Sequence, residues 1–286
     1  MKQFIHALYQ ISSKKPAAYH NNFFLELSAF GFKQIFSCLF PAFIFFMLVV
    51  SNLITLPFLP RYDFLLIACV LMQVIMYVTK IESGSELLVI TMFHLLGLVM
   101  EIYKVSMHSW SYPEFAYSKI YGVPLYSGFM YASVGSYVCQ AWRWFNLRII
   151  YWPGSFPALA ISAGIYINFF THHYLYDFRW VLTLLLIIIF WKTKVIFTSN
   201  TRERQMPLVF SFLLIGFFIW IAENMATYLG AWKYATQHEG WKMVSLGKIS
   251  SWFLLVVLSI VIVIQLKFFK LNLNKRDKAL IPHDSI

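Results

Sequence analysis

Charged side chains are scarce in this chain. Only 12% of its 286 residues are Asp, Glu, Lys or Arg, whereas 60% are hydrophobic and 20% are Phe, Trp or Tyr. A soluble globular domain carries about 25% charged residues, so these charges are too few to cover the surface of a water-soluble fold. The composition therefore indicates an integral membrane protein whose surface contacts lipid.

Cysteines and metal-binding motifs are scarce as well. Cys38, Cys69 and Cys139 lie in apolar segments and lack the paired spacing of a redox or zinc motif. No His-x-x-Glu-His or His-Glu-x-x-His run is present, so we expect no metal site. The cysteines are expected to be small packing residues, and the sequence leaves any cofactor unknown.

Long apolar runs are what the chain does contain. Eight segments of about 20 residues are each long enough to cross a hydrocarbon core of roughly 30 Å as a helix. We therefore predict an all-α, polytopic membrane bundle of about eight transmembrane helices. The segments are Ile35–Ile54, Tyr62–Val78, Glu86–Ser106, Pro124–Trp144, Phe156–Leu175, Phe178–Phe197, Pro207–Gly230 and Ile249–Phe269. The fifth and sixth are separated by two residues and can also be read as one broken hairpin.

The Lys and Arg residues predict the orientation of this bundle. With a cytoplasmic N-terminus, 16 of the 23 positive residues fall on the cytoplasmic side and seven fall outside. Because cytoplasmic loops carry an excess of Lys and Arg, both termini are predicted to be cytoplasmic, in a multi-pass protein of the inner membrane. The same distribution explains the net charge of +11, and no nucleic-acid partner is expected.

Three parts are predicted along the chain. Residues 1–22 have the pattern of an amphipathic segment on the cytoplasmic surface of the membrane, and residues 23–271 form the transmembrane domain. Residues 272–286 are polar and form a cytoplasmic tail.

A pattern that occurs twice provides the main functional candidates. Glu101, Trp110 and Tyr112 have the same spacing as Glu223, Trp232 and Tyr234. A carboxylate near the end of an apolar segment is costly and marks a functional site by default. Both copies lead into loops on the outer side, so the simplest model is an internal repeat of two four-helix halves. In a chain this rich in Trp and Tyr, a chance match is the alternative.

A third polar cluster lies between the two copies. Asn168, His172, His173, Asp177 and Arg179 fall within twelve residues, at the predicted turn between the fifth and sixth segments. A His-Asp pair suits a proton shuttle, because a carboxylate raises the basicity of the imidazole. The same pairs can instead simply stabilise a tight interfacial turn.

Two sets of site residues follow. The candidate acid and base residues are Glu101, Glu223, Asp177 and His173. The candidate substrate-binding residues are Trp110, Tyr112, Asn168, His172, Arg179, Asn224, Trp232 and Tyr234. Most other aromatic residues are expected to be interfacial belt residues.

Four sequence blocks resemble one particular family. They are WSYPE at 110–114, GVPLYSGFMYASVGSY at 122–137, NFFTHH at 168–173 with DFRW at 177–180, and IWIAEN at 219–224 with GAW at 230–232. They resemble the YoaT-like family of bacterial integral membrane proteins over roughly Phe32 to Leu266. This resemblance implies a membrane bundle and no particular activity.

A more distant motif is similar to one found in carotenoid hydratase and lycopene cyclase-type membrane enzymes. It combines Glu101, Trp110 and Tyr112 with Gly-Val-Pro-Leu at 122–125. The resemblance implies that Glu101, with Glu223 as its counterpart, protonates a carbon–carbon double bond. The second copy departs from the motif, with Gly-Trp-Lys-Met at 240–243, and the paired acids of the cyclases are absent.

Two functional hypotheses follow from these observations. In the first, membrane-embedded carboxylates in an outward-facing pocket bind or act on an isoprenoid-like lipid, as an apolar ligand taken from the membrane. In the second, the protein is a proton- or cation-coupled transporter of small molecules. A transporter needs polar groups through the full thickness of the membrane. The inner halves of the spans carry few of them, mainly Gln73, Gln140 and Gln265, which favours a single pocket.

Overall fold

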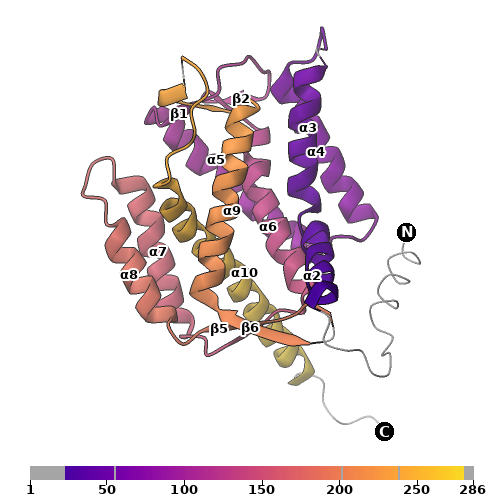
Figure 1. Cartoon of the computed structure of the whole chain (residues 1–286), viewed down its shortest axis with the longest axis vertical. Helices are drawn as coiled ribbons and strands as arrows, with labels where there is room; N and C mark the ends of the chain where they lie inside the picture. Colours follow the sequence, from indigo (N-terminus) through magenta and orange to yellow (C-terminus); the bar gives the residue numbers. More distant parts are fainter. Residues whose placement is uncertain (1–22, 55, 201, 238, 280–286) are drawn as a thin grey trace.

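The computed structural model describes residues 23–54, 56–200, 202–237 and 239–279, with side chains described as far as residue 265. Most of these residues are helical and form a bundle of roughly antiparallel helices (Figure 1). The helices are α2 (Phe23–Ser37), α3 (Leu39–Leu53), α4 (Arg61–Val78), α5 (Gly84–Ser106), α6 (Tyr126–Trp144), α7 (Ser155–Thr171), α8 (Arg179–Phe190), α9 (Leu208–Tyr228) and α10 (Lys248–Ala279).

Four helices are long and apolar enough to cross a membrane in the described part of the chain: α4, α5, α9 and residues 248–265 of α10. A fifth span results if α2 and α3, which are bent by 66° at their junction, count as one. Pro41 explains the bend, because it has no N–H and its ring crowds the carbonyl of Ser37. The predicted eight spans are therefore not confirmed.

The remaining predicted segments are helical but do not meet these criteria. Helix α6 has 19 residues and contains Ser, Gly and Gln residues, while α7 has only 17 residues and α8 only 12. The predicted sixth segment, Phe178–Phe197, is wrong in its last part. Helix α8 ends at Phe190, and Lys194–Thr198 forms a strand instead.

Short strands close both ends of the bundle, which the prediction of an all-α fold did not include. At one end, the sheet end, β4 (Arg148–Ile150), β5 (Lys194–Thr198) and β6 (Glu203–Pro207) form an antiparallel sheet. At the opposite end, the hairpin end, β1 (Trp110–Ser111) pairs with β7 (Lys233–Tyr234), and β2 (Lys119–Ile120) pairs with β3 (Val123–Pro124). Figure 1 shows β5 and β6 at the bottom of the bundle and β1 and β2 at the top.

Two close helix pairs position the site. Helix α5 packs on α6, where a Cβ on Gly97 would come within 2.5 Å of the Tyr131 ring. Helix α9 packs on α10, where a Cβ on Gly216 would come within 2.8 Å of the backbone nitrogen of Phe253. Glycine is needed at both crossings because it lets the helices approach this closely.

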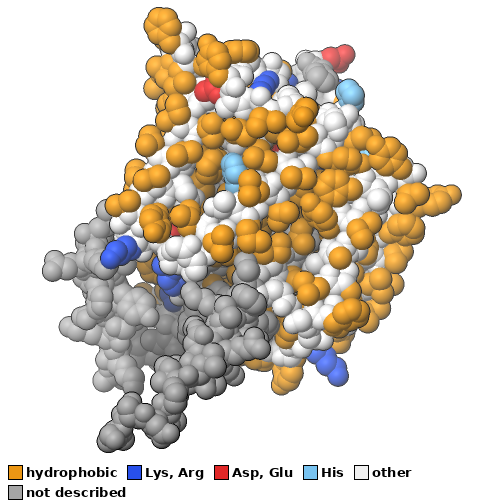
Figure 2. Space-filling model, turned by 180° about the vertical axis from the view of Figure 1, so that it is seen from behind, with side chains coloured by type: hydrophobic (Ala, Val, Ile, Leu, Met, Phe, Trp, Pro, Cys, Tyr) orange, Lys and Arg blue, Asp and Glu red, His pale blue; other side chains and the backbone are white. Residues whose placement is uncertain are grey.

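The lateral surface of the bundle is apolar. On the face shown in Figure 2, hydrophobic side chains dominate the middle, whereas Lys, Arg, Asp and Glu gather toward the two ends. Large hydrophobic side chains are exposed all along α4, α8 and α9. Such a surface is suited to contact with lipid.

The predicted division of the chain is only partly covered by the structure. Residues 1–22, the predicted amphipathic segment, lie outside the described residues. Helix α10 continues to Ala279, past the predicted end of the transmembrane domain at residue 271.

Candidate functional site

Glu101 is buried near the hairpin end of α5, with 4% of its surface exposed. Its Oε2 accepts hydrogen bonds from the Trp110 indole N–H and the Tyr112 hydroxyl, both at 2.7 Å. Its Oε1 accepts one from the Tyr131 hydroxyl of α6, at 2.8 Å. These three donors replace the water that the carboxylate would otherwise bind.

Glu223 occupies the corresponding place on α9 and is 3% exposed. Its Oε1 accepts a hydrogen bond from the Tyr234 hydroxyl, and its Oε2 accepts one from the Trp252 indole of α10, at 2.8 Å. An indole N–H can only donate, so one oxygen of each glutamate is fixed as an acceptor. The other oxygen meets a tyrosine hydroxyl, which can both donate and accept.

The two copies of the repeated pattern meet through the β1–β7 pair. Trp110 lies opposite Tyr234, and Ser111 lies opposite Lys233, the position 122 residues later (111 + 122 = 233). The rings of Trp110 and Tyr234 are 5.8 Å apart and edge-to-face. The strand pairing is symmetric, because exchanging the two copies gives the same register. Both glutamates therefore lie at the same end of the bundle.

The copies differ at their tryptophans. Trp110 donates to Glu101, but Trp232 is buried in an apolar cluster with Ala226 and Ala231. Trp252, which lies 29 residues after Glu223, donates to Glu223 instead. This spacing is similar to the 30 residues between Glu101 and its donor Tyr131. Each glutamate is thus bonded by a tyrosine 11 residues later and by an aromatic residue of the following helix.

Two lysines, the buried Lys104 and the half-buried Lys248, lie in the same region as the glutamates. The Lys248 Nζ lies 4.7 Å from the centre of the Tyr234 ring and 5.3 Å from that of Trp110. It is within electrostatic range of both glutamates. Lys104 is 4% exposed, and its Nζ contacts the Nε2 atoms of His172 at 3.2 Å and His173 at 2.9 Å. Within the described residues, neither lysine forms an ion pair closer than 4 Å.

The histidines are held as neutral acceptors. Burial, together with the Lys104 charge, lowers the pKa of both His172 and His173 below the usual value. The Nδ1 of His172 lies 3.0 Å from the backbone oxygen of Asn168, so this nitrogen carries the proton and Nε2 faces Lys104. No hydrogen bond joins either histidine to Asp177 among the described residues; the Nε2 of His173 contacts Lys104 instead.

The rest of the third polar cluster holds the α7–α8 turn. The Asn168 side-chain amide donates to Asp177 Oδ1 at 3.1 Å and accepts from the Phe178 backbone N–H. Asp177 forms an ion pair of 3.1 Å with Arg179, whose guanidinium also donates to Ser250 in α10. Burial raises the pKa of Asp177, but the hydrogen bonds and the Arg179 charge outweigh it, so the pKa lies below its usual value.

One predicted binding residue has a local structural contact. The Asn224 side chain donates to the Trp220 carbonyl and accepts from the Val244 backbone N–H at 2.8 Å. It therefore anchors the segment before α10 to α9.

A small cavity lies next to the glutamates, between α5, α6, α9 and α10. It has a volume of about 40 Å³, and its lining includes Tyr131 and Trp252, which donate to different glutamates, and Gly97. The other lining residues are mainly apolar. A water molecule needs at least about 10–15 Å³ of such volume, so the cavity is large enough for a few waters and too small for a lipid chain.

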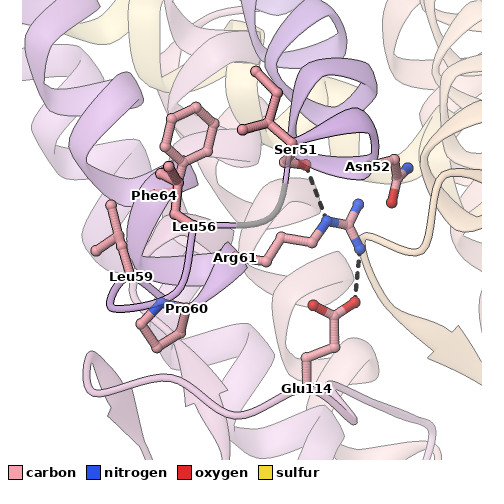
Figure 3. A pocket seen from close by; sticks show the side chains of 9 residues that line it. Ser51, Asn52, Leu56, Leu59, Pro60, Arg61, Phe64 and Glu114 are labelled. Carbon is pink, nitrogen blue, oxygen red and sulfur yellow. Dashed lines mark hydrogen bonds and ion pairs between the residues drawn. The ribbon is translucent and has the colours of Figure 1, made fainter.

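A larger cavity of about 350 Å³ lies at the hairpin end, where α3 meets α4 (Figure 3). The Arg61 guanidinium crosses it and donates to Ser51 Oγ and Glu114. It also donates to the backbone oxygens of Leu229 and Gly230. Arg61 thereby links α3 and α4 to the end of α9, and no predicted site residue lines this cavity.

Comparison with known proteins establishes the family. A family model described as "Protein of unknown function (DUF817)" matches residues 26–260. The chain belongs to the DUF817 family. It is 58% identical over 245 residues to "Uncharacterized protein YoaT" of Bacillus subtilis (strain 168), covering 86% of this chain and 93% of that protein. No solved structure matches.

These matches confirm the YoaT-like resemblance of the sequence blocks in this DUF817 member. They do not show the distant similarity to carotenoid hydratases and lycopene cyclases, which stays a prediction.

Sequence reasoning missed four residues of the site. Lys104 and Lys248 belong to the seven positive residues on the predicted outer side, and the only signal for Lys104 is that it follows Glu101 by about one helical turn. Tyr131 lies in the family-like sequence block at 122–137, and Trp252 is among the aromatic residues expected to form the interfacial belt. Searching for an aromatic residue about 30 positions after each glutamate finds both.

Proposed function

We propose that this protein binds and transfers protons within the membrane, at a centre formed by Glu101 and Glu223. One observation carries the proposal: two buried carboxylates lie at the same end of the bundle, each bonded to a tyrosine hydroxyl, beside a cavity sized for water. Tyrosine hydroxyls and ordered waters relay protons because they donate and accept at once. A proton- or cation-coupled transporter is the function class that uses such a centre.

The charges around the centre support this proposal. Glu101, Glu223 and Asp177 balance Lys104, Lys248 and Arg179, so the cluster is neutral when all six groups are charged. Adding or removing a proton therefore changes the net charge of the cluster, and the low-dielectric interior screens this charge weakly. Proton binding at either glutamate is thereby coupled to Lys248.

The symmetric register of β1 and β7 and the shared spacing of the donors support an internal repeat, with α5–α6 equivalent to α9–α10. In that arrangement, the two glutamates are equivalent sites on two halves related by an axis along the membrane normal. We further propose that the sheet end, which carries Arg148, Lys194 and Arg204, faces the cytoplasm of the inner membrane.

An isoprenoid-like substrate has less support. Ligand pockets have volumes of about 300–1,000 Å³, and the cavity beside the glutamates has about 40 Å³. A lipid site would require the helices to separate. Mass spectrometry of lipids that copurify with the protein tests this second reading.

Proton flux into liposomes tests the main proposal. The purified protein is reconstituted with a pH-sensitive dye inside, and a potassium diffusion potential drives proton entry. We expect flux above that of empty liposomes and a loss of roughly 10²-fold or more in Glu101→Gln and in Glu223→Gln. Tyr131→Phe and Tyr234→Phe, which remove the relay hydroxyls, should lower flux as well.

The matched control is Glu203→Gln. Glu203 lies on β6 at the sheet end and pairs with Arg148 at the surface, where both side chains are 54% exposed. Its removal should leave the flux unchanged. Wild-type flux equal to that of empty liposomes, or full flux in both glutamine variants, contradicts the proposal.

A further inference from the structure

Another buried carboxylate lies at the opposite end of α5. Glu82, in the turn between α4 and α5, is 1% exposed. Its Oε1 accepts a hydrogen bond from the Ser136 hydroxyl of α6, and its Oε2 accepts one from the Gln73 amide of α4. Three segments therefore enclose one carboxyl group that neither the repeat nor the third polar cluster includes.

The Gln73 side chain supplies a second observation. Its Oε1 is buried and has no hydrogen-bond partner among the described residues. If Glu82 takes up a proton, a half-turn of this amide brings Oε1 to the carboxyl group, where it accepts the new O–H. The Gln73 amide can thus accept a hydrogen bond from protonated Glu82 through Oε1, and it donates one to the charged carboxylate through Nε2.

The charged groups facing Glu82 come from α5 and α6. Burial has the largest effect and holds the pKa of Glu82 above its usual range, although the hydrogen bonds from Ser136 and Gln73 lower it; Glu86 raises the pKa further and Arg143 lowers it. Arg143 donates to Glu86 at 2.9 Å and to the Ile81 carbonyl at 2.7 Å, and it is 46% exposed. A partly exposed arginine therefore contacts the turn that carries Glu82.

Helices α5 and α6 connect Glu82 to Glu101. Position 101 lies about 25 Å along α5 from Gly84, close to the thickness of a bilayer core. On α6, Tyr131 donates a hydrogen bond to Glu101, and Ser136, five residues later, donates one to Glu82. His94 lies between the two glutamates on α5, and its buried Nδ1 has no partner in the described residues.

We propose that Glu82, held by Gln73 and Ser136, is a second proton-binding site that exchanges protons with the sheet end of the protein. As a step in proton movement, this rests on the proposed role of Glu101 and Glu223. The carboxylate takes one proton from a hydronium ion, which leaves water, and becomes a neutral carboxyl group; passing the proton to another water molecule forms hydronium and restores the charge. The site also supplies the inner polar groups that a transmembrane path requires.

Infrared spectroscopy tests proton binding at Glu82 directly. Difference spectra between about pH 5 and pH 8 should contain the carbonyl band of a buried protonated carboxyl group. The band of Glu82 should disappear in Glu82→Gln, where the bands of Glu101 and Glu223 remain, and it should persist in Glu203→Gln. If Glu82→Gln does not fold, Ser136→Ala keeps the carboxyl group and should shift the band, because it removes one hydrogen bond. A spectrum unaffected by these changes overturns the proposal.

Proton flux then tests the connection to Glu101. Glu82→Gln should lower the flux into liposomes by at least about tenfold, and wild-type flux in this variant overturns the proposal. If even the wild-type protein conducts no protons, the proposed function fails while the infrared result still decides whether Glu82 binds a proton. The two failures are therefore distinguishable.

Discussion

At the scale of single residues, placing a carboxylate away from water costs free energy. Insertion of an acidic side chain at the centre of a bilayer helix costs about 2.5–3.5 kcal/mol on insertion scales. Glu101 and Glu223 offset this cost with five hydrogen bonds from Trp and Tyr side chains. Aromatic donors suit the position because their rings remain apolar toward the surrounding helices.

The histidines at the α7–α8 turn give a pH dependence. Because the pKa of His172 and His173 is lower in the folded protein than in the unfolded chain, the unfolded chain binds more protons as the pH falls. The histidines' contribution to stability is therefore complete above about pH 6.5 and is lost as the pH falls through their folded pKa. Chemical unfolding in detergent at several pH values measures this loss.

The control is the double variant His172→Asn, His173→Asn, which keeps polar side chains without a titrating ring. Its free energy of unfolding should vary less with pH below about 6.5. A slope equal to that of the wild type contradicts the assignment of neutral histidines facing Lys104.

At the scale of elements, close helix pairs set the positions of the donors. Tyr131 reaches Glu101 because α6 lies close to α5 at Gly97, and Trp252 reaches Glu223 because α10 lies close to α9 at Gly216. The distance between the helix axes therefore determines whether each donor reaches its glutamate. A methyl group added at either glycine would change the hydrogen bonds of the carboxylate without contacting it.

Gly216→Ala should separate α9 from α10. The added Cβ would lie 2.8 Å from the Phe253 backbone nitrogen, which cannot move without its helix. We expect a destabilisation of about 1–3 kcal/mol and a weaker Trp252–Glu223 bond, seen as a change in indole fluorescence. Gly31→Ala, where a Cβ meets nothing within 4 Å, is the control and should be neutral or slightly stabilising. Equal stability of both variants would argue against the close α9–α10 contact.

The sequence predicted the helices better than their role in the membrane. Apolar length located α4, α5 and α9, but it could not show that Lys194–Thr198 pairs with two other strands, because that pairing is non-local. The repeat located both glutamates and their tyrosines. Equal spacing does not determine which tryptophan faces the carboxylate, since Trp252 and not Trp232 donates to Glu223. Glu82 was missed since it lies between apolar segments and carries no motif.

At the scale of the whole molecule, charge divides the bundle into two ends. Lys33 donates to the Thr198 carbonyl of β5, and Glu26 pairs with Arg202 and Arg204, so α2 is tied to the sheet end. The hairpin end carries the glutamate centre and Arg61. The apolar surface between them matches a membrane-embedded middle.

Cysteine labelling tests the proposed orientation. In a variant with Cys38, Cys69 and Cys139 replaced by Ala, a single cysteine is placed at Tyr117 or at Glu203. Tyr117 is 76% exposed at the hairpin end, and Glu203 is exposed at the sheet end. A maleimide that cannot cross the inner membrane should label Tyr117→Cys in intact cells and Glu203→Cys only after lysis. The reverse pattern contradicts the orientation.

The β1–β7 pair also has a consequence for biogenesis. All donors to Glu101 lie within 30 residues after it, and all donors to Glu223 lie within 29. The glutamates are 122 residues apart (223 − 101 = 122), which corresponds to roughly 6–24 s of synthesis at 5–20 residues per second. Each carboxylate can thus acquire its own partners while the chain leaves the ribosome, and the strands that join the two centres pair only after the second half has entered the membrane.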